Sequence, residues 1–379
     1  MSEHQYYEFQ AIDRTLDRAA QEALRSISSR ARITAMSFTN YYEWGDFKGD
    51  PSKLMEQWFD LHLYLANWGT RRLMMRLPKR LVCRADIDPF LREIDWVRVW
   101  NSGNNLIVDI HHDEAEPDDE WDDGSGRLAT LAPLRSDVLS GDFRLFYLLW
   151  LTAVQEHLVA DDAVEPLAGI GPLTGALHGF AQFFGVDPDL VQAAGERGAD
   201  VAATSKDDLR EMLAAVPEGE KIELLQRVVE GDNHVAAELR RRLLKEHAVS
   251  AAPRTVATLR MRALEIGKTR ESAAAEWKEA ERRRQAEEAE RACRAGLKAL
   301  RQRGEGVWRE IEDEIERRSA AGYDRAASLL SDLQVLALEE GGQNDFLGRL
   351  ASIRARHERK GKFIERLEGL GRSNDERAA

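Results

Sequence analysis

The sequence predicts an α+β N-terminal domain, a helical middle segment and a C-terminal region made of a long helix and a helical hairpin. In the first domain we expect a mostly antiparallel sheet with helices on one face. Three observations support this prediction. Paired runs of alternating apolar and polar residues lie before residue 112, most aromatic residues lie before residue 184, and the second half is rich in Ala, Glu, Arg and Leu.

The first 112 residues change repeatedly between strand-like and helix-like spacing. Aromatic and β-branched runs favour strands, and apolar residues three to four positions apart favour helices. Two turn segments, 67–70 and 101–105, each lie between alternating runs, so they predict two hairpins. The expected strands are residues 5–12, 32–42, 61–65, 73–77, 96–100 and 106–110. The expected helices are residues 13–29, a short helix that starts within residues 50–52 and runs to 59, and residues 86–93.

An acidic segment marks the first domain boundary. The run HHDEAEPDDEWDDGSG holds eight carboxylates between Asp113 and Asp123 and ends in Gly-Ser-Gly, so we expect a solvated linker. Amphipathic helices separated by Gly and Pro loops follow it. The expected divisions are an α+β domain at 1–112, an acidic linker at 113–127, a helical middle domain at 128–250 and a long charged helical region at 251–379.

The last region has the composition of a coiled-coil-like helix. Beyond Pro253 the chain contains no proline and is crowded with Ala, Glu, Lys and Arg, which predicts a long helix to about Arg303. Its apolar positions thin out between Trp277 and Leu297, so a strong dimeric seam is not expected. Glycines at 304 and 306 then interrupt the helix, and the apolar stripes after them predict a helical hairpin.

Charge and cysteine content exclude several classes of protein. The formal net charge of −13 argues against a surface that attracts nucleic acid everywhere. No run approaches the ~20 apolar residues that a membrane-spanning helix needs, and no signal peptide is evident, so we expect a soluble protein. The only cysteines, Cys83 and Cys293, match no metal or redox spacing. This usage is typical of a reducing compartment, and we expect a cytoplasmic location.

A basic segment between residues 71 and 84 is the first candidate site. It contains six cations and no carboxylate, and Trp68 stands just before it. Such a segment can bind nucleic-acid phosphates, with the tryptophan as a stacking surface. It can equally pair with the acidic linker or form a solvated strand face. The candidate residues are Arg71, Arg72, Arg76, Lys79, Arg80 and Arg84.

Two further groups of polar residues follow strands of the first domain. Asp109 and His111 share one face of a strand and form a weak candidate for a metal site, and the favoured alternative is a strand that runs into an acidic loop. Glu8 lies within the first strand and Asp13 follows it, which places charges beside a pocket in one interpretation. In the other interpretation, Asp13 or Asp17 caps a helix and the charged residues form a surface ion pair. No metal or other cofactor is expected.

A second basic cluster lies near the C-terminus. Arg356 and Lys360 form part of a basic rim beside the apolar pair Phe363 and Ile364. On a helix, this pattern indicates a partner-binding or helix-packing surface more often than a nucleic-acid site.

Several motifs of common enzymes are absent from the sequence. It contains no GxxxxGK[ST], GxGxxG after a strand, GxSxG, HExxH or paired CxxC. The run Ile266-Gly267-Lys268-Thr269 matches only the end of a phosphate-binding loop and lies in a helix-forming stretch.

Four runs carry a resemblance to other proteins: YYEFQAIDRTL, SRARIT, YLANWGTRRLMMRLP and KGKFIERL. They resemble those of an uncharacterised bacterial protein family, over most of the chain. The resemblance implies a bacterial, cytoplasmic protein and brings no activity, cofactor or site residue. Bacterial proteins of this layout are often parts of multi-protein systems, which is an argument by analogy.

Three hypotheses of function follow. The leading one is an interaction or scaffold component of a bacterial multi-protein system, without catalysis, which binds a protein partner or associates with itself through its C-terminal helices. The second is a nucleic-acid-associated accessory protein that binds through residues 71–84. The third is an enzyme with an unfamiliar site near Asp109 and His111. None of the three involves a membrane.

Overall fold

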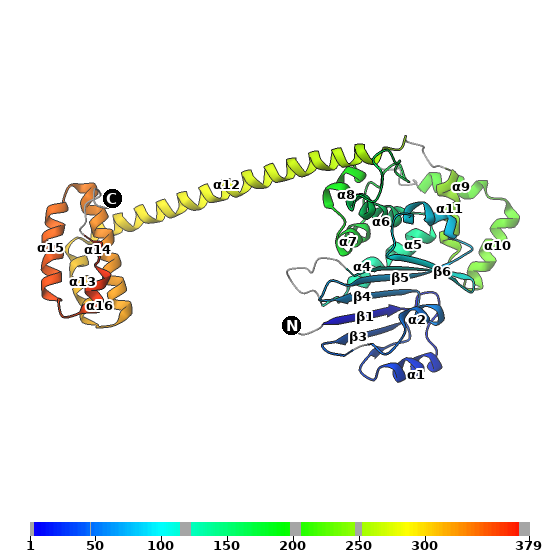
Figure 1. Cartoon of the computed structure of the whole chain (residues 1–379), viewed down its shortest axis with the longest axis horizontal. Coiled ribbons are helices and arrows are strands. Elements are labelled where there is room, and N and C mark those ends of the chain that lie inside the picture. Colours follow the sequence, from blue (N-terminus) through cyan, green and yellow to red (C-terminus); the bar gives the residue numbers. More distant parts are fainter. Residues whose placement is uncertain (1–3, 46, 114–122, 198–205, 247–251, 371–379) are drawn as a thin grey trace. The chain divides into compact units, whose positions relative to one another are not determined.

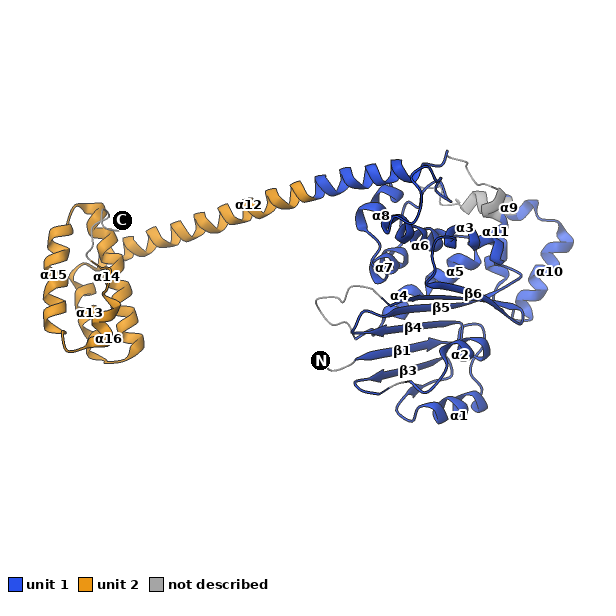
Figure 2. Ribbon diagram, in the orientation of Figure 1, with its two compact units in different colours: residues 1–270 blue, residues 271–379 orange. Residues whose placement is uncertain are grey.

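The computed structural model describes residues 4–45, 47–113, 123–197, 206–246 and 252–370. The chain forms two compact units, residues 1–270 and residues 271–379 (Figure 2). The first unit contains a seven-stranded antiparallel sheet, and helices follow the sheet along the chain (Figure 1). The predicted α+β class, with an antiparallel sheet followed by a helical region, is therefore confirmed.

The sheet has the strand order β2-β3-β1-β4-β5-β7-β6, and every neighbouring pair is antiparallel. Both predicted hairpins are present, β4 with β5 and β6 with β7, and each turn contains a glycine with positive φ, Gly69 and Gly103. The predicted strand 32–42 is divided into two strands by a tight turn in which the Thr34 amide donates to the carbonyl of Ser37. The strands are β1 (Gln5–Gln10), β2 (Arg32–Ile33), β3 (Ser37–Tyr42), β4 (Leu61–Ala66), β5 (Arg71–Pro78), β6 (Val97–Ser102) and β7 (Asn105–His112).

Helices cover both faces of the sheet, whereas the sequence predicted helices on one face. Helices α1 (Arg18–Ile27) and α2 (Pro51–Gln57) share a core with Phe9 and Met74, and the later helices of the first unit share another with Leu73 and Met75. Alternate residues of β5 thus enter different cores, because successive strand residues point to opposite faces. A central strand buried on both faces reads as a continuous apolar run. This explains the apolar stretch from Leu73 to Met75.

The helices after the sheet extend its larger core. Helix α6 is buried along its whole apolar length from Leu145 to Val154. The first turns of the long helix add Val256, Leu259 and Ile266 to the same core. The predicted division between residues 1–112 and 128–250 stays a prediction, although side chains from both segments share this core. These helices are α3 (Arg84–Leu91), α4 (Arg127–Leu131), α5 (Pro133–Leu139), α6 (Arg144–Gln155), α7 (Gly175–Phe183), α8 (Pro188–Gly195), α9 (Lys206–Ala215), α10 (Glu218–Val229) and α11 (Val235–Glu246).

The predicted long helix is present as α12, which spans Val256–Arg303 and crosses the division between the two units. Four helices after it build the core of the second unit around Val307, Ile311, Leu330 and Phe363. They are α13 (Glu305–Glu316), α14 (Ala320–Glu340), α15 (Gln343–Arg356) and α16 (Gly361–Arg366). Within the described ranges, no helix combines the length and the apolar character needed to cross a membrane.

Candidate functional site: an open polar face of the sheet

One face of the sheet changes from apolar to polar along a single row of paired residues. Leu73 and Leu63 pair across β5 and β4, and both are fully buried under the helices. On the next strands, Leu63 pairs with Glu8, Glu8 with Thr39, and Thr39 with Arg32. Glu8 and Thr39 are half-buried, and Arg32 is exposed. The helices thus cover the apolar end of the row and leave its polar end open.

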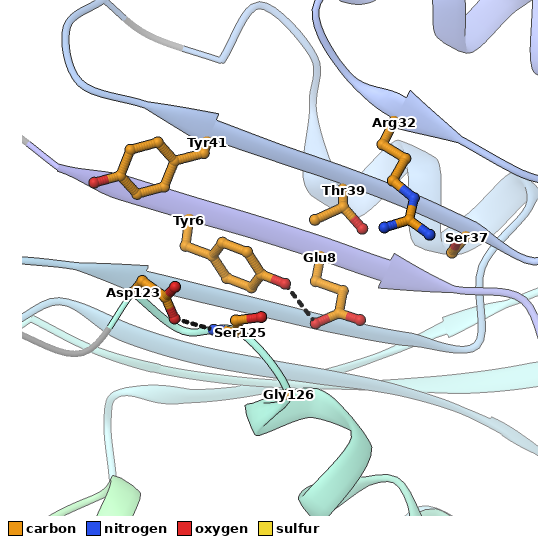
Figure 3. Close-up of a pocket in the computed structure, with 9 residues that line it drawn as sticks. All are labelled: Tyr6, Glu8, Arg32, Ser37, Thr39, Tyr41, Asp123, Ser125 and Gly126. Atoms are coloured by element: carbon orange, nitrogen blue, oxygen red, sulfur yellow. Dashed lines mark hydrogen bonds between the residues drawn. The ribbon is translucent and has the colours of Figure 1, made fainter.

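The open end contains a cavity of about 570 Å³, which we call the β1–β3 pocket. Figure 3 shows its lining side chains, which come from β1, β2, β3 and the loop before α4. They are two tyrosines, two carboxylates, one arginine, three small hydroxyl or glycine residues at the rim, and a threonine between the charges. The lining residues are Tyr6, Glu8, Arg32, Ser37, Thr39, Tyr41, Asp123, Ser125 and Gly126.

Glu8 is the most unusual group of the pocket. Its carboxylate is half-buried and accepts a hydrogen bond of 2.9 Å from the Tyr6 hydroxyl. Burial raises the pKa of Glu8, and the hydrogen bond from Tyr6 opposes this shift only in part. Burial and the neighbouring carboxylate likewise raise the pKa of Tyr6. Among the described residues, no lysine or arginine forms an ion pair with Glu8. The carboxyl group of Glu8 therefore lies in the pocket without an ion-pair partner among the described residues.

The loop before α4 forms one wall of the pocket by approaching Tyr6 closely. Gly124 has a φ of +79°, and a Cβ added there would lie 2.6 Å from a carbon of the Tyr6 ring. Only glycine tolerates both conditions without strain. Next to it, the Ser125 amide donates to the Asp123 carboxylate at 2.8 Å. This arrangement holds a second carboxylate beside the Tyr6 ring, where it adds to the raised pKa of Tyr6.

The sequence pointed to Glu8 and Asp13 together, and the structure separates them. Asp13 accepts two hydrogen bonds from Arg135, at 3.0 and 2.7 Å, and a third from His234 at 3.1 Å. Burial alone would raise the pKa of Asp13, but these hydrogen bonds hold it well below its usual range. Asp17 caps α1 by accepting from the Ala20 amide, as the alternative interpretation expected.

Half of the six cations of the basic segment lie in β5 and belong to the structure of the sheet. Arg76 is 5% exposed, and its guanidinium donates to the Asp60 carboxylate from Nε at 3.0 Å and from Nη2 at 2.7 Å. Asp60 is itself fully buried. On the other face of β5, Arg71 is also 5% exposed and donates to the carbonyl of Phe183 at 2.5 Å. Neither guanidinium is available to phosphates.

The exposed members of the segment also have partners within the chain. Arg80 makes two hydrogen bonds to Asp232, at 2.8 and 2.6 Å, and Lys79 donates to a backbone carbonyl at 2.7 Å. Arg84 forms a surface ion pair of 3.1 Å one turn along its own helix. Trp68 is 45% exposed, and its indole donates to a threonine hydroxyl two residues later. Of the predicted linker partner, residues 114–122 lie outside the described part of the chain.

In the weak candidate for a metal site, arginine side chains already bind the carboxylate of Asp109. Asp109 is fully buried and accepts from Arg72 at 2.7 and 2.9 Å and from Arg98 at 3.0 Å. His111 lies beside it and forms a 3.1 Å contact with Asp113. Burial and the nearby Arg72 lower the pKa of His111. Among the described residues, no group of three or more ligating side chains could hold a metal ion.

The C-terminal cluster belongs to the packing of the second unit, in which α15 and α16 pack on α14 and make polar contacts with α13. Phe363 is fully buried in the core of the second unit, and Ile364 packs at its edge. Arg356 donates to a carboxylate of α13 at 2.7 Å, and the Lys360 ammonium contacts the carbonyl of Ile315 at 3.2 Å. The structure thus places these residues in the helix-packing alternative. Because Phe363 is buried and both cations contact α13, less of this cluster is open to a partner.

No known family model matches the chain, and no curated protein or solved structure is significantly similar to it. The candidate site therefore rests on its own geometry. Sequence reasoning found Glu8 but missed Tyr6, Arg32 and Thr39. The alternation of Tyr6 and Glu8 in the first strand was the available signal, because residues two apart share a face.

Proposed function

We propose that the protein is an interaction component of a bacterial, cytoplasmic multi-protein system and recognises its partner through the β1–β3 pocket, without catalysis of its own. One observation carries this proposal: Glu8 is half-buried at the floor of an open pocket and has no cationic partner among the described residues. A buried charge without a partner is costly, and such a cost is commonly retained where a ligand supplies the partner.

The composition of the pocket supports binding over chemistry. Its nine lining residues include no histidine, cysteine or lysine, and the hydroxyl group hydrogen-bonded to Glu8 is that of Tyr6, whose raised pKa makes it a poor nucleophile. Its hydroxyl groups and aromatic rings suit recognition of an extended polar segment on a sheet face. The hypothesis of an enzyme near Asp109 and His111 is less well supported, because arginines bind both oxygens of Asp109.

The nucleic-acid hypothesis is the second candidate, and the exposed residues Lys79, Arg80 and Arg84 are what favours it. It loses support because Arg71 and Arg76 are buried and because Arg80 is held by Asp232. A phosphate would have to displace these internal partners, which weakens the binding that the segment offers.

A capture experiment with a matched pair of variants tests the proposal. The tagged chain is recovered from its native host at moderate salt, with and without nuclease, as wild type, Thr39→Tyr and Ser26→Tyr. Tyrosine at position 39 fills the pocket, whereas position 26 is exposed on α1 and does not line it. Both substitutions introduce the same side chain at an exposed or half-exposed position.

We expect a stoichiometric protein partner that survives nuclease, is lost with Thr39→Tyr and is kept with Ser26→Tyr. A partner that binds all three chains equally would refute the pocket as the recognition site. Nucleic acid alone, recovered without nuclease and lost when Lys79, Arg80 and Arg84 are neutralised together, would favour the second candidate.

A further inference from the structure

We infer that the β1–β3 pocket binds an alkylammonium or guanidinium group, and that this group is a lysine or arginine side chain presented by the partner. The inference rests on the proposed function and deepens it, because it names the chemistry that the pocket selects. The charges, the aromatic rings and the strand register of the pocket support it.

The charge at the floor selects a cation. Glu8 has one oxygen bound by the Tyr6 hydroxyl, which leaves the other oxygen for a donor from the ligand. Burial makes the ionised form of Glu8 less favourable, and a bound cation would oppose that effect. Asp123 adds a second negative charge from the loop. The net charge of −13 of the whole chain also attracts cations over longer distances.

The rings and hydroxyl groups fit an organic cation on a carbon stem. Tyr6 and Tyr41 both line the pocket, so a stem of methylene groups can lie against aromatic carbon while its charged end reaches Glu8. Thr39 lies between Glu8 and Arg32 on the paired strands and offers a hydroxyl to the same ligand (Figure 3). A bare metal ion would use none of these apolar contacts.

Arg32 limits how many cationic centres a ligand of the pocket can have. It lies two strands from Glu8 in the same row, and strands are about 5 Å apart, so the backbone positions of the two residues are roughly 10 Å apart. No ion pair joins the two side chains in the structure. We therefore assign Arg32 to the rim, where it repels a second cation and restricts the pocket to a ligand with one cationic centre.

Titration of the full chain with small probes tests the inference. The probes are n-butylammonium, n-butylguanidinium, Nα-acetyl-lysine N-methylamide and the neutral n-butanol, each at low ionic strength. Amide signals of the loop residues Gly124, Ser125 and Gly126 report occupancy in heteronuclear NMR spectra. We expect saturable shifts with the three cations, none with butanol, and weaker binding as NaCl is added.

Variants then separate the roles of the charges. Glu8→Gln keeps the shape of the side chain and should weaken all three cations about tenfold. Arg32→Gln should tighten them a few-fold, because it removes a repelling charge. The control is Glu22→Gln, which removes a surface carboxylate on α1 outside the pocket and should change nothing. Binding that is unaffected by Glu8→Gln, or equal shifts with butanol, would overturn the inference.

The source of the cation is decided by comparing two probes. If the acetylated lysine amide binds at least as well as butylammonium, the pocket accepts a side chain that is part of a peptide. If butylammonium binds and the lysine amide is excluded, a free amine is the ligand and the assignment to a partner is wrong. If no cation binds but Thr39→Tyr still abolishes partner capture, the inference fails and the proposed function stands.

Discussion

Replacing Arg76 with methionine should lower the free energy of unfolding of the first unit by about 3 kcal/mol. The arginine belongs to a run of basic residues that reads as a surface, yet it is 5% exposed. Its guanidinium donates twice to Asp60 and once, at 3.3 Å, to the carbonyl of Met55. Methionine keeps much of the aliphatic volume, so the change removes the charge and its hydrogen bonds with little effect on packing.

The magnitude follows from what remains around Asp60. Removing one partner of a buried ion pair costs about 3–5 kcal/mol, because the other charge stays buried without compensation. Asp60 keeps donors from the amides of Ile12 at 2.6 Å and Asp13 at 2.9 Å, and Arg135 lies 3.6 Å away. These contacts place the expected loss at the lower end of that range. Even so, it is a large part of a typical stability of about 5–15 kcal/mol.

Urea unfolding of the full chain at neutral pH measures this loss, with Arg84→Met as the matched control. Arg84 pairs with Asp88, and the two side chains are 61% and 50% exposed. An exposed pair contributes about 0.5 kcal/mol, so the control should be almost unchanged. Equal losses in the two variants would refute the reasoning, because they would mean that the remaining donors satisfy Asp60. The same contrast shows why Arg76 is unsuitable for testing nucleic-acid binding.

Three further predictions concern the pocket and the second unit. Burial raises the pKa of Glu8, so protonated Glu8 stabilises the folded state at acidic pH, and this stabilisation is lost as pH rises through the raised pKa. Glu8→Gln should therefore be more stable than wild type toward neutral pH and lose this advantage below the ordinary glutamate range. Thermal unfolding across pH measures the difference. Gly124→Ala should cost more than Gly126→Ala, by about 1 kcal/mol or more, since both have a φ of +79° but only the first meets the Tyr6 ring; equal losses in urea unfolding would contradict this. Phe363→Ala should destabilise the second unit by about 3–5 kcal/mol, as seen in hydrogen exchange of its helices, whereas a small loss would point to a side chain free to bind a partner.

Features with a local signal were predictable from the sequence. The two hairpins follow from alternation on either side of short turns, and Gly69 and Gly103 supply the positive φ that these turns use. The start of α2 follows from Asp50 and Pro51, since the aspartate accepts from two amides of the first turn. The long helix follows from composition and the lack of proline. In each case neighbouring residues determine the structure.

Features that depend on strand order were beyond a single sequence. The pocket exists because Glu8, Thr39 and Arg32 fall in one row, and this row depends on the register of three strands. Alternation along β5 does show that Arg72 and Arg76 share a face. It does not show that buried carboxylates bind these arginines, because Asp60 lies sixteen positions before Arg76 and resembles any loop aspartate in the sequence. A cluster of charges in sequence is therefore a poor guide to a charged surface.

Among the described residues, the middle of α12 is exposed along its length, so its conformation rests on the helix itself. Between residues 271 and 296 almost every side chain is exposed, and glutamates pair with arginines four positions later. Glutamate before arginine is the favourable order on a helix, and each pair contributes about 0.2–0.5 kcal/mol. Because no core constrains this stretch, evolution can lengthen or shorten it by whole turns without repacking either unit. We expect both its length and its sequence to differ among related chains, because no core contact constrains either.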